Sequence, residues 1–225
     1  MLLFSGVAQA QSGGFGVAPQ DVAQLSASGA VEVQQDLLTL TLSTSREGAD
    51  AAVVQMQLRQ ALDSALIVAK GAALPGQLDV RTGNFSLYPR HDKAGKITGW
   101  QGSTALVLEG RDFARITAAT AKIQSLTIAG VGFALSREQR ARVEAEAQAL
   151  AIDQFKAKAA DIARAFGFTT TTLREIAVSA SDSGFSPRPR MMAAQARGEV
   201  DDASLPVEAG KSTVLVTVSG SVQMK

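Results

Sequence analysis

The feature that most constrains the fold is the alternation of apolar and polar residues near both ends of the chain. In three runs, apolar side chains share one parity among serines, threonines and glutamates. The runs are Val214, Val216, Val218, Val222 and Met224 near the C-terminus, Leu25, Ala27, Val31 and Val33 near the start, and Leu38, Leu40 and Leu42 after them. Successive side chains of a strand point to opposite faces of a sheet, so this pattern predicts half-buried β-strands at both ends.

Two segments have helical periodicity instead. Residues 50–70 place apolar side chains three or four positions apart, with Asp50 as the expected N-cap and Gly71 as the residue that ends the helix. A longer helix is predicted from Ser136, which forms a capping box with Gln139, to Gly167. Its alanine-rich stripe would allow close approach to a sheet.

Between these segments the pattern predicts a β-hairpin over residues 78–110, with a β-bulge at residues 83–84 where the alternation changes parity. Further expected elements are a short helix from Asp112 to Ile123 and strands over residues 127–135 and 169–181. The predicted class is therefore α+β, with antiparallel sheets and two main helices packed on one face.

Composition excludes several classes of protein. The hydrophobic fraction of 46% is enough for a core, and 22 basic against 21 acidic residues leave no electrostatic footprint for nucleic acid. The chain has no cysteine, which excludes disulfides, thiol nucleophiles and thiolate metal sites. No apolar run reaches the roughly 18 to 20 residues of a transmembrane helix.

The first residues resemble the end of a secretory signal. Ala8, Gln9 and Ala10 have the small-x-small form of a cleavage site after a short apolar stretch. We interpret residues 1–10 as the remnant of a signal peptide that starts upstream, cleaved after Ala10, and residues 11–23 as a flexible lead-in. The alternative is an apolar N-terminal tail without a targeting role.

The sequence does not assemble a reaction site. His91 is the single histidine, so any Ser-His-Asp triad would depend on it, and no Gly-x-Ser-x-Gly elbow is present. Glu144 with Glu146, and Asp201 with Asp202, are neighbouring carboxylates without the fixed gap of a glycosidase pair. We expect no catalytic, cofactor-binding or metal-binding residues, and an exposed His91.

The segment 182–206, rich in glycine and proline, is expected to be a long mobile loop. It carries the sharpest candidates for contact with a partner or an acidic lipid headgroup, namely Arg188, Arg190, Met191 and Met192. The alternative is a solvated connector, because acidic residues nearby neutralise the arginines. Oxidation of the two methionines would let the loop consume oxidants.

Four segments resemble the SIMPL-domain family, long described as a domain of unknown function. They are residues 26–33 followed by Asp36, residues 88–103 through Arg111 and Asp112, the alanines of the long helix before Gly167, and residues 206–210 before the last strand. The resemblance spans about residues 24–224. It implies a single domain over residues 24–225, an exported envelope protein, ring assembly in some members and a link to oxidative stress defence, with no established catalytic residues.

These observations lead to one expected function and two alternatives. We expect an exported structural or interaction protein of the periplasm or cell envelope. It would lack catalytic activity and cofactors, would be able to self-associate or to contact the outer membrane peripherally, and would place its last strand, Val214 to Met224, at a sheet edge. The first alternative is a periplasmic module that captures a small ligand or peptide near loop 182–206. The second is an envelope hydrolase that uses His91.

Overall fold

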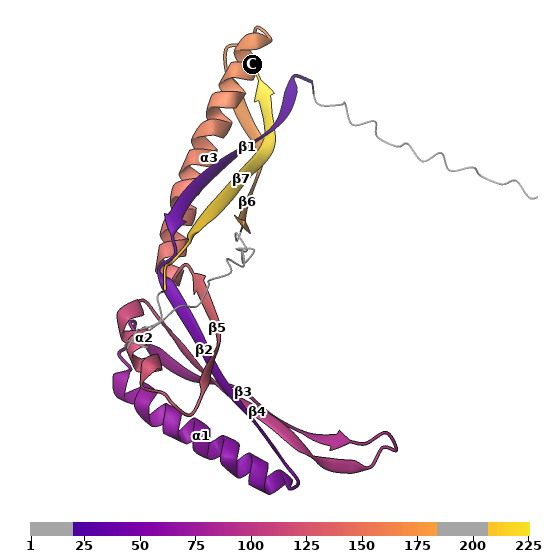
Figure 1. Cartoon of the computed structure of the whole chain (residues 1–225). Coiled ribbons are helices and arrows are strands. Elements are labelled where there is room, and N and C mark those ends of the chain that lie inside the picture. Colours follow the sequence, from indigo (N-terminus) through magenta and orange to yellow (C-terminus); the bar gives the residue numbers. More distant parts are fainter. Residues whose placement is uncertain (1–19, 184–206) are drawn as a thin grey trace, which may run out of the picture.

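The computed structural model describes residues 20–183 and 207–225, which form seven strands and three helices in the predicted order. Figure 1 shows an elongated molecule with two lobes arranged end to end. The elements are β1 (Val22–Gln34), β2 (Leu37–Gly48), α1 (Ala51–Ala72), β3 (Asp79–His91), β4 (Ile97–Gly110), α2 (Phe113–Ala121), β5 (Thr127–Ala134), α3 (Arg137–Ala165), β6 (Thr171–Ser183) and β7 (Lys211–Met224). The α+β class predicted from the sequence is confirmed.

The first lobe, here the α3 lobe, is a three-stranded antiparallel sheet in the order β1-β7-β6 with α3 on one face (Figure 1). The alternating valines of β7 are buried under α3, as the sequence predicts. The expectation that the last strand lies at a sheet edge is wrong, because β7 is hydrogen-bonded to β1 on one side and to β6 on the other. Apolar residues on both neighbouring strands make this central position favourable.

Small side chains let α3 lie close against its sheet. The buried stripe of the helix consists of Val143, Phe155 and four alanines, Ala147, Ala151, Ala159 and Ala163. Gly29 of β1 lies directly beneath this stripe, where a Cβ atom would be 2.2 Å from the carbonyl oxygen of Ala147. Only glycine fits at this point of contact.

The second lobe, here the α1 lobe, is a four-stranded antiparallel sheet in the order β3-β4-β2-β5, with α1 and α2 on one face (Figure 1). Its core combines large side chains with four buried alanines of the helices, Ala61, Ala65, Ala69 and Ala119. The fully buried large side chains include Leu38, Leu40, Leu42, Leu58, Leu78, Leu106, Leu108 and Ile116. The two long helices therefore cover one face each of different sheets.

Most local signals act as expected. Asp50, Asp112 and Ser136 are N-caps whose side chains accept backbone N–H groups, and Gly167 follows α3 with φ of +85°. The predicted end of α1 is wrong, because the helix continues through Gly71 to Ala72. The cap is residue 73, whose N–H bonds the carbonyl of residue 70. The short helix α2 ends at Ala121, before the expected Ile123.

The hairpin of β3 and β4 carries the predicted bulge. The register between these strands shifts between Thr82 and Phe85, around residues 83–84. At the tip of the hairpin the carboxylate of Asp92 accepts the N–H groups of Ala94 and Lys96. Figure 1 shows this hairpin projecting beyond α1.

Two expected segment boundaries shift. Strand β1 begins at Val22, inside the expected lead-in 11–23, and β6 continues to Ser183, inside the expected loop 182–206. The predicted signal-peptide remnant over residues 1–10 lies outside the described residues. None of the helices in the described ranges is long and apolar enough to cross a membrane.

Candidate functional site

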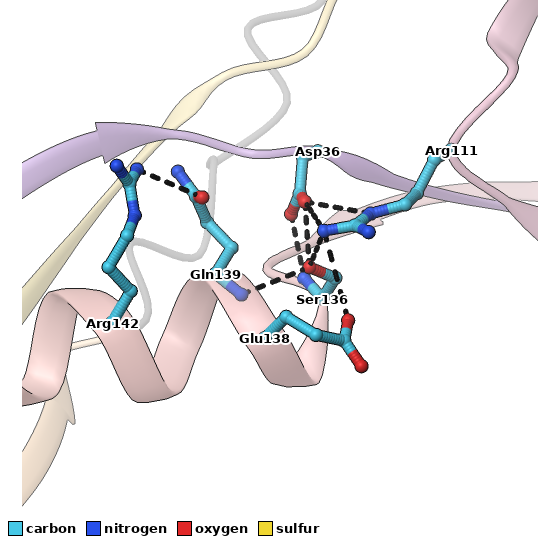
Figure 2. Close-up of polar contacts among 6 residues, drawn as sticks. All are labelled: Asp36, Arg111, Ser136, Glu138, Gln139 and Arg142. Atoms are coloured by element: carbon cyan, nitrogen blue, oxygen red, sulfur yellow. Dashed lines mark hydrogen bonds and ion pairs between the residues drawn. The ribbon is translucent and has the colours of Figure 1, made fainter. Parts of the chain in front are cut away.

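The clearest polar constellation lies where the chain crosses between the two lobes. The β1–β2 connection crosses at Gln35 and Asp36, and the β5–α3 connection crosses at Leu135 and Ser136. Arg111, which follows β4, reaches the same place (Figure 2). We call Asp36, Arg111 and Ser136 the junction cluster. It joins residues from three segments that are far apart in the sequence.

Asp36 is the centre of the cluster. Its Oδ1 accepts the backbone N–H of Ser136 at 2.7 Å, and its Oδ2 accepts the Ser136 hydroxyl at 2.7 Å. The same Oδ2 accepts Arg111 Nε at 3.1 Å and Nη2 at 2.9 Å (Figure 2). The carboxylate therefore receives four hydrogen bonds, two of them from a guanidinium group, which is the stronger charge-assisted type.

These contacts set the ionisation of Asp36. Partial burial raises the pKa of the carboxyl group, but the hydrogen bonds from the backbone and hydroxyl of Ser136 and from Arg111, with the positive charge of Arg111, outweigh burial. The net result is a pKa below the ordinary value of 3.8. The carboxylate is therefore ionised, and bound to its partners, at neutral pH.

Ser136 links the cluster to the start of α3. Its hydroxyl oxygen accepts the N–H of Gln139 at 3.2 Å and Arg111 Nη2 at 2.7 Å, while its own proton goes to Asp36. In a complete capping box the Gln139 side chain would accept the Ser136 N–H. Here Asp36 accepts that N–H, and Gln139 Oε1 accepts Arg142 instead (Figure 2).

This arrangement suits structural linkage better than bond-making. The Ser136 hydroxyl is buried, donates to a carboxylate and caps a helix, so it lacks the free general base that a nucleophilic serine needs. Glu138 adds a second carboxylate 3.8 Å from Arg111. All the charges of the cluster are directed at one another, across the point where the lobes meet.

The residues considered from the sequence as catalytic candidates do not gather. His91 is exposed at the end of β3, on the projecting hairpin, and its neighbour Asp92 is engaged in the hairpin turn. Glu144 and Glu146 lie on α3. Within residues 20–183 and 207–225, no three His, Asp or Glu side chains are close enough to hold a metal ion.

The predicted contact residues Arg188, Arg190, Met191 and Met192 lie outside the described residues, as do Asp201 and Asp202. A shallow hollow of about 610 Å³ lies between β1 and α3, where Lys158 Nζ donates to the carbonyl oxygen of Ser26 at 3.0 Å. Its lining offers one lysine and one aspartate, which define no cofactor.

A second surface feature is an apolar strip on β6. We give this name to Leu173, Ile176 and Val178, whose exposed fractions are 52%, 45% and 48%. They pair with Val222, Gly220 and Val218 of β7, so they share the face of the sheet that α3 covers. The helix packs mainly on β1 and β7 and leaves this edge strand uncovered.

Sequence reasoning identified Ser136 as a cap, and Asp36 and Arg111 as parts of two separate motifs, but not their convergence. A charge needs a partner only where it is buried, and the sequence does not show that the two-residue connection at Asp36 is partly buried. The strip on β6 was missed because its alternation was not separated from that of the buried strands.

The fold and the junction define a two-lobed α+β protein whose motif residues connect its lobes. A family model described as "SIMPL: Protein of unknown function (DUF541)" matches residues 23–222, so the chain belongs to the SIMPL family. The resemblance noted from the sequence is confirmed.

Other comparisons add little. No curated protein matches the chain significantly. A solved structure described as "The crystal structure of AtUAH in complex with glyoxylate" is 14% identical, with a TM-score of 0.29. That match covers 56% of this chain and 33% of the other, and it is too weak to carry an argument.

Proposed function

We propose that this protein is a non-catalytic interaction protein of the cell envelope that self-associates through β6. The observation that carries the proposal is the apolar strip on an edge strand. Burying its three side chains against a second copy would remove apolar area from water, at about 25 cal/mol per Å². The unpaired backbone groups along the same strand would gain hydrogen bonds.

The other sheet edge of the α3 lobe is protected, which supports β6 as the contact. Along β1, Lys158 reaches over the strand and occupies the carbonyl of Ser26. Between its bulge at Arg174 and residue 181, β6 carries the single charge of Glu175, and residues 176–181 carry none. Edge strands without charges or prolines are the ones that pair with other chains.

The α1 lobe has one protected edge and one short one. Strand β3 contains Pro89, several charges and a bulge, all of which oppose pairing. Strand β5 is uncharged but has only 8 residues, with its own register shift against β2. We therefore assign the main contact to β6.

The test is the substitution Val178→Lys, which places a charge in the centre of the strip. Val178 is half exposed, so we expect the variant to fold and to lose self-association. Ile67→Lys is the matched control, because Ile67 is 76% exposed on α1, away from the strip. Light scattering and sedimentation across micromolar concentrations would measure the change.

The expected result is an oligomer for the unmodified protein and for Ile67→Lys, and a monomer for Val178→Lys. A monodisperse monomer for the unmodified protein would refute self-association. An unchanged oligomer for Val178→Lys would show that the protein self-associates through a surface other than β6.

The location belongs to the same proposal and is supported by the Ala8-Gln9-Ala10 sequence and by the SIMPL membership. Fractionation of the native cell and N-terminal sequencing of the mature protein would test it. We expect a periplasmic protein that begins at Gln11. A mature form found inside the cell and still bearing Met1 would contradict export.

A role in oxidative stress tolerance is the most specific part of the proposal. It is supported by the resemblance stated from the sequence and by the paired Met191 and Met192. Growth of a deletion strain under peroxide, complemented with the chain carrying leucine at both positions, would test it. Full rescue by that variant would exclude the methionines as the responsible groups.

A further inference from the structure

The two lobes share little packed surface. Among the described residues, the extensive contacts between helices and strands all lie within one lobe or the other. The large core of the α1 lobe and the main core of the α3 lobe contain buried residues from their own lobes. A third, smaller cluster packs Leu135 of the β5–α3 connection against Val143 and Val214 of the α3 lobe, but it contains no side chain from the sheet or helices of the α1 lobe. Contacts other than a shared core must therefore help to fix the angle between the lobes.

Two short connections cross between the lobes at the same place. Between β1 and β2 there are only Gln35 and Asp36, and between β5 and α3 only Leu135 and Ser136. Asp36 N–H donates to the carbonyl of Ala134 at 3.2 Å, so the connections are also paired through their backbones. Such a pair of adjacent connections forms a hinge unless side chains brace it.

The junction cluster braces this hinge from three directions. Asp36 lies in one connection, Ser136 lies in the other and starts the helix of the α3 lobe, and Arg111 extends from the end of β4 in the α1 lobe. Rotation of either lobe about the connections would separate at least one of these pairs. We propose that Asp36 is a latch that holds the two lobes of this protein at a fixed angle.

Two charged side chains of the described residues face the latch. Arg111 comes from the end of β4, and Glu138 from the first turn of α3 faces Arg111 at 3.8 Å. Glu138 competes weakly for the guanidinium, because its side chain is 73% exposed whereas Asp36 is 28% exposed. When acid protonates Asp36, the carboxyl group keeps fewer acceptor sites and loses its charge, so the latch opens as the pH falls.

Opening leaves the lobes attached. The backbone hydrogen bonds Asp36 N–H to Ala134 O and Gln35 N–H to Gly210 O do not involve the Asp36 side chain. Val207 also packs against the core of the α1 lobe. We therefore expect a wider range of lobe angles without unfolding of either lobe.

The experiment uses the absence of native cysteine. Gln60→Cys on the exposed side of α1 and Ala149→Cys on the exposed side of α3 introduce two labelling sites, one in each lobe. Single-molecule energy transfer between dyes at these sites reports the distance between the lobes. It is measured in the full chain at picomolar concentration, so self-association does not contribute.

Asp36→Ala and Asp36→Asn are compared with Asp112→Ala. Asp112 is a suitable control because, like Asp36, it accepts a backbone N–H at the start of a helix and bonds an arginine, but it does so within the α1 lobe. We expect both Asp36 variants to broaden or shift the transfer distribution, and Asp112→Ala to leave it unchanged. The unmodified chain should show the same broadening at low pH.

Hydrogen exchange on β1, β2, β4 and β7 distinguishes lobe motion from unfolding. A broadened distribution with both sheets still protected supports the latch. An unchanged distribution in folded Asp36→Ala overturns it, and if that variant does not fold, the isosteric Asp36→Asn decides in the same way. Because energy transfer is measured on single molecules, a result that contradicts the latch does not depend on whether the protein self-associates.

Discussion

The two lobes build the same layers, helix on antiparallel sheet, from different side chains. The α1 lobe buries leucines of its sheet against Leu58, Ile116 and several alanines of its helices, whereas the α3 lobe buries mainly valines of its sheet against Phe155 and alanines, with Gly29 beneath the helix. Large side chains keep layers apart and fill the space between them, while small ones let backbones approach. The lobes should therefore fail in opposite ways: the α1 lobe when volume is removed, the α3 lobe when volume is added.

The largest expected effect is a cavity in the α1 lobe. Leu108 is fully buried between β2, β3 and the helices, and Leu108→Ala should lower the free energy of unfolding by about 2–5 kcal/mol. Val218→Ala in the α3 lobe should lower the free energy of unfolding by less, because it removes fewer carbon atoms and leaves a smaller cavity. Urea unfolding of both variants measures the difference. An equal loss of unfolding free energy in the two variants would contradict the contrast between the lobes.

The next largest effect is overpacking of the α3 lobe. Gly29→Ala adds a Cβ atom 2.2 Å from Ala147 O and 2.7 Å from Ala151 N, so the helix must move. This shift should lower the free energy of unfolding by about 1–3 kcal/mol. The matched control is Gly130→Ala on β5, where nothing lies within 4 Å of the added atom. Thermal unfolding should separate the two variants, and similar melting temperatures would show that α3 accommodates the methyl group freely.

The smallest expected effect is the pH dependence of the stability that Asp36 contributes where the two lobes meet. The folded pKa of Asp36 lies below 3.8, so its contribution to stability is present above 3.8 and is lost as the pH falls through the lowered value. The difference in unfolding free energy between the unmodified chain and Asp36→Asn should therefore shrink in acid. Urea titrations at a series of pH values measure it, and a constant difference would exclude ionisation of Asp36 as its cause.

Local features of the fold were predictable because their causes lie within a few residues. Asp50, Asp112 and Ser136 cap helices through N–H groups two or three residues away, and the bulge near Gly83 follows from a change of parity. Gly71 misled the prediction, because a glycine can sit inside a last helical turn when no left-handed residue is required.

The candidate site was only half predictable. The sequence offered Asp36, Arg111 and Ser136 as separate signals, and nothing local connects residues 75 and 100 positions apart. The strip on β6 depends on where α3 lies, since Ile176 and Val178 alternate as regularly as the buried valines of β7, and a bulge at Arg174 brings Leu173 to the same face. Burial distinguishes them only after the helix has been placed over β1 and β7.

The amino-acid sequence by itself determined the order of the elements, the apolar face of the alternating strands and the starts of the helices, because period and capping act over a few bonds. The tertiary structure decided that β7 lies between β1 and β6, that two sheets form, and that one carboxylate joins them. Those outcomes depend on which surfaces pack together, and the packing free energy comes from residues that are far apart in the sequence.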